Sequence, residues 1–508
     1  MGLVTAVSRA IGFGRVLFVA AVLGASGLGD TFTASNAFSN VVFELIAAGA
    51  LSAVLVPTFV RLIERGDDAE AQRLAGGLAW YATWVLGAVA LVGVIGAPLL
   101  ARLLTAGISG DTHDARALTA TLLRWFVPQI VLYGFGALAT AALYARRRFA
   151  ITAAAPIANT VVMVVSLAIF RVVAGADPGL ALSGEERVLL GVAGTGGVIG
   201  FVGVLLIAAR RAGFAIVPRR VPRSDTAFRE LVGHGVRGVA LQSIVGLLLG
   251  AAILLGAGVT GGVVAYQAAF VFFLAPYAIL AQPLHTAVLP ELSVLAASGR
   301  LEDVAGRLRW TLRTIAHLVL PATAMAMALA HPGFALLRVG AFDERGAALA
   351  AAAFVGLAAG LLPYSAFLLL ARASYALDDS RTPALVAVIA GTFGAAVMAA
   401  GAIVSDGSAQ VAWLGAGHSV AYLLGAVVLG RVIARRVHGR LVPRAFLAPL
   451  LASGLAGVVA LAIGHASETR PRAIAMGVVT IAVAAGVATY VAVMRLARQP
   501  LRPAEPAG

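Results

Sequence analysis

Apolar stretches of 18 or more residues recur along the whole of this 508-residue chain. A stretch of that length crosses the hydrocarbon core of a bilayer as an α-helix, which satisfies its own backbone hydrogen bonds in lipid. Because 60% of the residues are hydrophobic and only 12% are charged, a soluble multidomain protein is excluded. The sequence therefore predicts an all-α integral membrane protein.

Glycine, proline and charged clusters divide the apolar sequence into fourteen predicted transmembrane helices. Several exceed the roughly 20 residues that a bilayer requires, which implies tilted helices. They cover residues 3–26, 31–60, 74–104, 115–144, 149–173, 187–209, 228–257, 262–295, 309–331, 347–376, 382–404, 409–433, 445–465 and 472–495.

Arginine is distributed unevenly between the two sets of connections. All 38 basic residues are arginine, and 26 of them follow even-numbered helices or lie in the C-terminal tail. By the positive-inside rule, both termini are predicted to be cytoplasmic. The net charge of +15 would suit a nucleic-acid-binding protein, but this alternation assigns the charge to membrane topology. We expect the bilayer, and no nucleic acid, as a partner.

Two segments of the chain repeat at a displacement of about 233 residues. Residues 53–57 (AVLVP) correspond to residues 286–290 (TAVLP), and each proline is followed after nine residues by a glycine. Duplicated bundles that rock about a central site are a common transporter plan. The repeat predicts two six-helix lobes plus two C-terminal helices. The predicted boundaries are 1–212 for the first lobe, 213–227 for a cytoplasmic linker, 228–438 for the second lobe and 439–508 for the last two helices and tail.

Sequence signatures of soluble enzymes are missing. The chain has no H-E-x-x-H, Walker or G-x-S-x-G pattern and no cysteine. We therefore expect a transporter rather than an enzyme, with no cofactor and no metal site. Its energy would come from the membrane potential or from a gradient of a monovalent ion. The glycine-rich stretch at residues 194–200 is interpreted as close helix packing.

Charged side chains inside the first two predicted helices are the main functional candidates, because ionisable groups in lipid persist where they pair or line a wet cavity. Arg15 lines a cavity or forms a structural ion pair. Glu44 pairs with Arg15 or contacts a substrate. Asp30 caps the start of its own helix, contributes to function, or does both.

Two further arginines lie within predicted helices. Arg124 precedes Trp125 and is either an interfacial anchor or a functional residue. Arg237 shares a helix face with His234 and is a candidate for a cavity. The predicted helix at 262–295 contains three prolines, so we expect it to be broken or strongly kinked.

Short patterns in order along the chain carry a family resemblance. Together they resemble the MurJ/MviN family of lipid II flippases, within the multidrug/oligosaccharidyl-lipid/polysaccharide exporter superfamily. The patterns are SRAIGFGR at 8–15; GA at 24–25 with Asp30, Phe32 and Asn40; AGA at 48–50 with VP at 56–57; RF at 148–149 with AP at 155–156 and Asn159; and DSRTP at 379–383.

The resemblance implies a fourteen-helix bundle around a cationic cavity. Such proteins move lipid II, the undecaprenyl-diphosphate-linked peptidoglycan precursor, from the inner to the outer leaflet of the bacterial plasma membrane. By motif, Arg15 and Asp30 match essential cavity positions, and Arg15 would face the diphosphate. The predicted substrate-binding residues are Arg15, Asp30, Asn40, Glu44, Arg124 and Arg237.

The sequence also departs from the family pattern. Many members have paired arginines shortly after the Asn40 position, where this chain has Phe43 and Glu44. The arginine that many members carry early in helix eight is also missing. We expect Arg124 and Arg237 to compensate. The predicted function is a monomeric lipid II flippase working by alternating access. The alternatives are a flippase for another polyprenyl-linked glycan, a non-transporting cell-wall scaffold and a cation-coupled drug antiporter.

Overall fold

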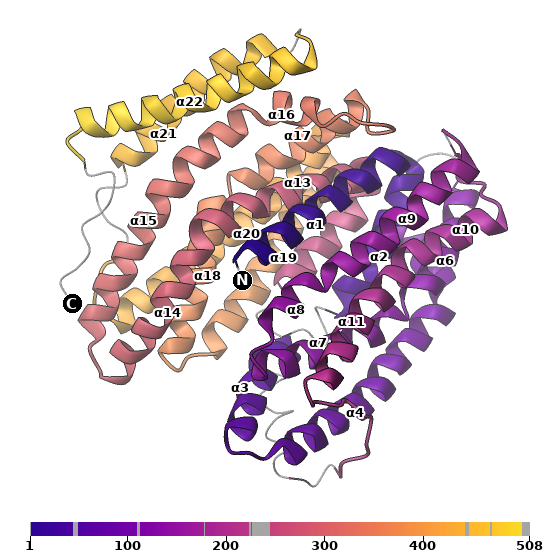
Figure 1. Ribbon diagram of the computed structural model, residues 1–508. Helices are drawn as coiled ribbons and strands as arrows, with labels where there is room; N and C mark the ends of the chain where they lie inside the picture. The colour runs from indigo at the N-terminus through magenta and orange to yellow at the C-terminus, as the bar shows by residue number, and fades with distance from the viewer. Residues whose placement is uncertain are drawn as a thin grey trace. The chain divides into compact units, whose positions relative to one another are not determined.

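The computed structural model describes residues 2–43, 49–108, 112–176, 178–222, 225, 244–441, 447–467 and 470–499. Within these ranges the regular structure is helical and includes no β-strand (Figure 1). This confirms the all-α prediction. The chain splits into two compact units, one of Met1–Val264 with Gly340–Phe342 and one of Ala265–Val339 with Asp343–Gly508.

Among the described residues, the first unit contains twelve α-helices up to Gly256. They are α1 (Gly2–Leu23), α2 (Gly27–Phe43), α3 (Gly49–Glu64), α4 (Asp68–Ile95), α5 (Ala97–Leu104), α6 (His113–Phe126), α7 (Gln129–Ala145), α8 (Phe149–Ala154), α9 (Pro156–Ala174), α10 (Gly184–Gly191), α11 (Gly197–Arg211) and an apolar helix over Ile244–Gly256. A π-helical turn, Val192–Gly196, joins α10 to α11.

Helix α13 begins in the first unit and continues into the second. The remaining helices belong to the second unit. They are α13 (Gly262–Pro276), α14 (Gln282–Ala297), α15 (Leu301–Ala328), α16 (Ala330–Leu336), α17 (Glu344–Ala358), α18 (Leu361–Ala376), α19 (Arg381–Val404), α20 (Gly407–Arg436), α21 (Leu447–Gly464) and α22 (Arg472–Leu496), with a short 3-10 turn at His465–Ser467.

Nine helical stretches among the described residues are long and apolar enough to cross a membrane, and two bent pairs bring the number to eleven. These eleven coincide with predicted spans three to six and eight to fourteen. Predicted spans one, two and seven correspond to α1, to α2 with α3, and to the helix at Ile244–Gly256. Parts of spans two and seven lie outside the described residues. The count of fourteen, the cytoplasmic termini and the lobe boundaries therefore stay predictions.

The two repeated segments turn the chain in the same way. Gly66 has φ 75° and Gly299 has φ 71°, a left-handed conformation that glycine adopts without a steric penalty. The Gly66 amide donates to the Ile63 carbonyl at 3.0 Å, and the Gly299 amide donates to the Ala296 carbonyl at 3.0 Å. Helices α4 and α15 each begin two residues later. The sequence repeat is thus matched by a repeated helix ending.

The proline-rich predicted span at 262–295 differs from our expectation. Gly262–Ala297 is a single 36-residue helical stretch, and a π-helical turn at Tyr277–Ala281 lies within it. A π turn adds a residue to the helix and is a common place for a bend, but this stretch is not among the helix pairs bent by more than 40°. The prediction of a broken or strongly kinked helix was wrong here. A bend of 47° occurs instead between α17 and α18, just before Pro363.

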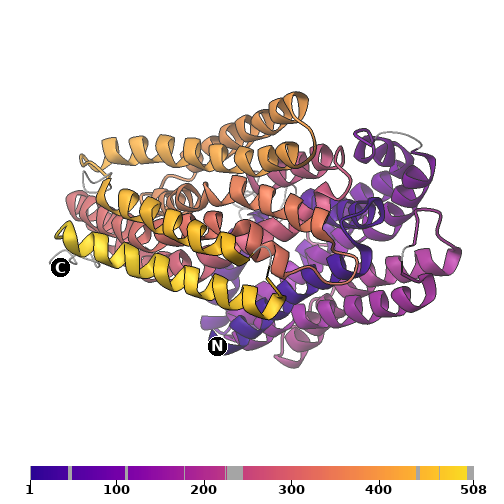
Figure 2. The same ribbon diagram turned by 90° about the horizontal axis from the view of Figure 1, so that it is seen from above.

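Close helix crossings in the second unit depend on small residues. A Cβ atom added to Gly356 on α17 would lie 2.3 Å from the carbonyl oxygen of Ala412 on α20, and one added to Gly415 would lie 2.3 Å from that of Ala353. These backbones approach more closely than larger side chains would permit. Helices α21 and α22 form a side-by-side pair in both views (Figure 1, Figure 2).

Candidate functional site

The break between α6 and α7 in the first unit exposes backbone carbonyls that need partners. Pro128 lies at this break and has no N–H, so the preceding turn loses helical hydrogen bonds. The Thr195 hydroxyl donates to the carbonyl of Trp125 at 2.6 Å, and the Ser39 hydroxyl donates to that of Phe126 at 2.7 Å. Two hydroxyls from distant segments therefore stabilise the break.

Thr195 lies in the π-helical turn Val192–Gly196, inside the glycine-rich stretch. A Cβ atom on Gly194 would lie 2.4 Å from the ring of Phe126, and one on Gly191 would lie 2.5 Å from the ring of Trp125. The glycines thus allow the aromatic end of α6 to pack against this turn. The predicted packing role is confirmed, and it brings the Thr195 hydroxyl to the break.

A polar network extends from the break into the helix bundle. The fully buried Gln129 donates from Nε2 to the Thr195 hydroxyl at 3.0 Å, and its Oε1 accepts from the Tyr133 hydroxyl at 3.2 Å. The Asn40 side chain on α2 lies close to the Tyr133 hydroxyl. Side chains of α2, α7 and the π turn therefore meet at one place, which we name the Tyr133 network (Asn40, Gln129, Tyr133 and Thr195).

Arg15 on α1 lies beside this network. Its guanidinium lies near the Tyr133 hydroxyl, and its side chain is half-buried. It makes no ion pair or hydrogen bond with any residue in the described ranges. A half-buried cation of this kind, next to uncharged hydrogen-bonding groups, attracts an anionic ligand.

Asp30 does not form the cap that was one of its two predicted roles, and its predicted substrate binding stays a prediction. Helix α2 begins at Gly27, and the Ser26 hydroxyl accepts from the Gly29 amide at 3.2 Å, so Asp30 does not cap its own helix. Its carboxylate instead accepts from the amides of Gly261 at 2.6 Å, Val263 at 3.0 Å and Val264 at 3.0 Å. Asp30 is only 6% exposed. It therefore caps α13 from a distance and positions α2 against it.

The remaining predicted site residues are only partly placed. Asn40 belongs to the Tyr133 network. Arg124 is exposed on α6, and the neighbouring Trp125 packs against Gly191. Glu44 and Arg237 lie outside the described residues, as does the predicted pairing of Glu44 with Arg15. Their roles in substrate binding stay predictions.

The second unit surrounds its own break with aromatic rings. Tyr364 follows Pro363, and its ring lies 4.8 Å from that of Tyr277 and 4.7 Å from that of Tyr422. The Tyr266 hydroxyl hydrogen-bonds to the ring of His418 at 3.1 Å. Among the described residues no group of three or more potential metal ligands occurs. The break of the second unit is thus packed mainly by rings.

The comparisons with known proteins agree with one another. A family model described as "Lipid II flippase MurJ" matches residues 19–488. The chain belongs to the MurJ lipid II flippase family. Similar relatives include the probable lipid II flippase MurJ of Rhizobium tropici, at 27% identity over 75% of this chain and 71% of the relative. The lipid II flippase MurJ of Burkholderia cenocepacia is 27% identical over 76% of this chain and 73% of the relative.

Solved structures show the same fold. A MurJ structure described as inward closed superimposes with a TM-score of 0.76 at 17% identity, covering 98% of each chain. An inward-facing multidrug transporter of the MATE family gives a TM-score of 0.63 at 12% identity, covering 85% of this chain and 94% of the transporter. At these identities the likeness concerns the fold alone. The resemblance stated from short motifs is confirmed, and the chain is a multi-pass membrane protein of the MurJ family.

Sequence reasoning missed the residues that connect the site. Tyr133 and Gln129 are ordinary residues of an apolar span, and Thr195 was noted only as part of the glycine-rich stretch. One signal was available, because Pro128 predicts unpaired carbonyls that nearby hydroxyls must satisfy. That argument would have drawn attention to serine and threonine residues in neighbouring spans.

Proposed function

We propose that this protein moves lipid II from the inner to the outer leaflet of the bacterial plasma membrane. Its membership in the MurJ family supports this function. The single observation that carries the proposal is the Arg15 guanidinium, which has no acidic partner in the described residues and lies beside the Tyr133 network.

The residues of the site suggest distinct roles. Arg15 binds the diphosphate, because a guanidinium can hold two phosphate oxygens at once. Asn40 and Tyr133 offer donors and acceptors to the hydroxyl and amide groups of the sugar and peptide. Asp30 acts through α2 by holding the helix in place. Arg124 and Arg237 supply further positive charge, and Glu44 reduces the net positive charge of the site.

The transport cycle is part of the same proposal. Two six-helix lobes, with fourteen helices in all and cytoplasmic termini, expose the site alternately to the two leaflets. The membrane potential or a monovalent ion provides the energy, since the sequence has no nucleotide motif. The protein acts as a monomer, and the two C-terminal helices accompany the prenyl chain.

The test uses a bacterium depleted of its own lipid II flippases and expressing this chain. We expect lipid II to become accessible to an outer-leaflet probe and growth to be restored. Unchanged surface lipid II would refute the proposal. If a different polyprenyl-linked glycan appears outside instead, the substrate assignment is wrong. Restored growth without lipid II transport would indicate a scaffold, and ion-dependent drug efflux alone would indicate an antiporter.

Arg15→Ala tests the site within that assay. We expect at least a tenfold loss of lipid II exposure, because a charge-assisted hydrogen bond contributes about 1.5–3 kcal/mol. Arg15→Lys should show an intermediate loss of lipid II exposure, since lysine keeps the positive charge but cannot bind two phosphate oxygens at once. Arg116→Gln, an exposed arginine on α6, is the control and should behave like the wild type. An active, well-expressed Arg15→Ala variant would contradict the role of Arg15.

A further inference from the structure

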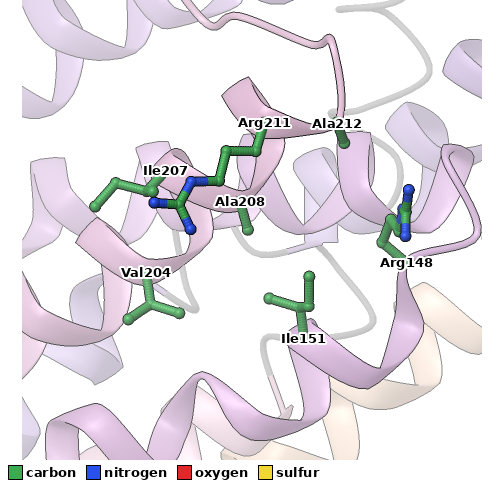
Figure 3. Close-up of a pocket in the computed structure, with 7 residues that line it drawn as sticks. All are labelled: Arg148, Ile151, Val204, Ile207, Ala208, Arg211 and Ala212. Carbon is green, nitrogen blue, oxygen red and sulfur yellow. The ribbon is translucent and has the colours of Figure 1, made fainter.

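A second feature of the first unit lies apart from the Tyr133 network. It is a cavity of about 530 Å³ between α8 and α11. Figure 3 shows Arg148 and Arg211 on two sides of the cavity, with Ile151 and Val204 beneath them and Ile207 beside Arg211. The cavity thus combines an apolar floor with two guanidinium groups at its rim. We name it the α8–α11 cavity.

The two rim arginines differ from their neighbours in the sequence. Arg146 pairs with Asp68 at 2.8 Å, and Arg147 lies 3.9 Å from Glu64. Arg148 and Arg211 are exposed, and neither guanidinium has an ion pair or hydrogen bond with a described residue. Positive charge that nearby acids leave unneutralised is therefore concentrated at the cavity.

The apolar floor continues along α11 away from the arginines. Ile207 is 56% exposed and Ile199 is 55% exposed, two turns apart on the same helix. Between them, a Cβ atom at Gly203 would meet no other atom within 4 Å. These residues leave an open apolar track that begins under the guanidinium groups. Its length suits an alkyl chain better than a compact polar ligand.

We propose that the α8–α11 cavity binds one anionic glycerophospholipid of the surrounding bilayer. The phosphate lies between Arg148 and Arg211, whose planar groups match phosphate oxygens, and an acyl chain lies along Ile207, Gly203 and Ile199. Both arginines stand at the end of the helices where most arginines of the chain gather. Basic pockets between transmembrane helices on that side attract acidic lipid headgroups.

The experiment uses the full chain purified in nanodiscs that contain phosphatidylglycerol and phosphatidylcholine. Lipid that remains bound after transfer to detergent is counted by native mass spectrometry. We expect one retained phosphatidylglycerol on the wild type. The double variant Arg148→Gln/Arg211→Gln should bind it about tenfold more weakly or worse, because two basic contacts are lost. Arg147→Gln/Arg210→Gln removes the same charge beside the cavity and should retain the lipid.

A further variant and a competition experiment test the apolar track and the kind of ligand. Gly203→Leu obstructs the apolar track and should weaken binding of the intact lipid without removing charge. Glycerol phosphate should not displace the lipid, which separates a lipid site from a site for free phosphate. Equal losses in both double-arginine variants would show diffuse attraction and overturn the proposal, as would retention in Arg148→Gln/Arg211→Gln. Since none of these residues belongs to the Tyr133 network, lipid II transport is measured in parallel as an independent readout.

Discussion

The two units break a corresponding helix pair at a proline, and each stabilises the break in a different way. At Pro128 two hydroxyls bind the freed carbonyls, and the next residue is the buried amide Gln129. At Pro363 the Ser419 hydroxyl donates to the Gly356 carbonyl at 2.5 Å, and the next residue is the aromatic Tyr364. Hydroxyl donors to backbone carbonyls are common to both breaks.

The difference lies in the residue that comes directly after each proline. An amide continues the hydrogen bonding as far as Tyr133, whose hydroxyl lies close to Asn40 and Arg15. A tyrosine in the second unit instead packs its ring between other rings. The same backbone event therefore supports a polar site in the first unit and an apolar core in the second. The predictions begin with the largest expected effect on transport, which tests this contrast directly. Effects on stability follow in decreasing order.

The sharpest test compares one hydroxyl in each unit. Tyr133→Phe removes the hydroxyl that donates to Gln129 and lies close to Asn40 and Arg15. Lipid II exposure should therefore fall about tenfold, the equivalent of roughly 1.4 kcal/mol. Tyr364→Phe keeps the ring contacts and should leave exposure within about twofold of the wild type. The assay is outer-leaflet lipid II in the flippase-depleted bacterium. Equal losses of lipid II exposure in the two variants would contradict the proposed difference between the two units.

Asp30 provides the largest expected change in stability. Asp30→Asn removes a buried charge that accepts three backbone hydrogen bonds, and we expect unfolding to become easier by about 2 kcal/mol. Chemical denaturation in detergent measures this change. Asp406→Asn is the matched control, because Asp406 precedes α20 without a side-chain cap bond. A loss of transport at full stability would instead indicate direct contact with the substrate.

The two serines at the breaks should have similar, smaller effects. Ser39→Ala and Ser419→Ala each leave a buried carbonyl without its donor, which costs about 1 kcal/mol in the free energy of unfolding. Transport should distinguish them, with only Ser39→Ala reducing lipid II exposure. If both variants transport lipid II normally, the hydroxyl at the break between α6 and α7 stabilises the fold and has no role in transport.

The smallest prediction concerns the loop before α19. Burial raises the pKa of Asp379, but hydrogen bonds from Thr382 and Arg381 and the charge of Arg436 outweigh it and lower the pKa overall. Stabilisation by this carboxylate is therefore present above its unfolded pKa of about 4 and is lost as the pH falls through the lower folded value.

We expect Asp379→Asn to cost only about 0.5 kcal/mol at neutral pH and little under acid conditions. The amide oxygen still accepts the two backbone hydrogen bonds, and only the attraction to Arg436 is lost. Denaturation midpoints at several pH values measure this difference. Asp378→Asn is the control, because asparagine tolerates the positive φ of 57° at that position. A pH-independent loss in Asp379→Asn would exclude a role for its charge.

Hydropathy and charge placement predicted most of the helices, because a span must be apolar over its whole length. Partners distant in the sequence were harder to predict. Asp30 binds amides 231 to 234 residues away, and its local sequence suggests a cap for its own helix. Tyr133 and Thr195 are unremarkable within an apolar span, and only folding brings them together. The π turn after Pro276 was missed because sequence periodicity does not reveal it.

Asp30 also neutralises the positive end of the α13 helix dipole in the first unit. The start of a helix carries about half a positive charge, which makes it a natural anion site. At the start of α13 the Asp30 carboxylate already occupies that position. An incoming diphosphate would therefore meet no attraction from this helix dipole. Because Asp30 is only 6% exposed, the positive end of α13 is also closed to an anion from outside.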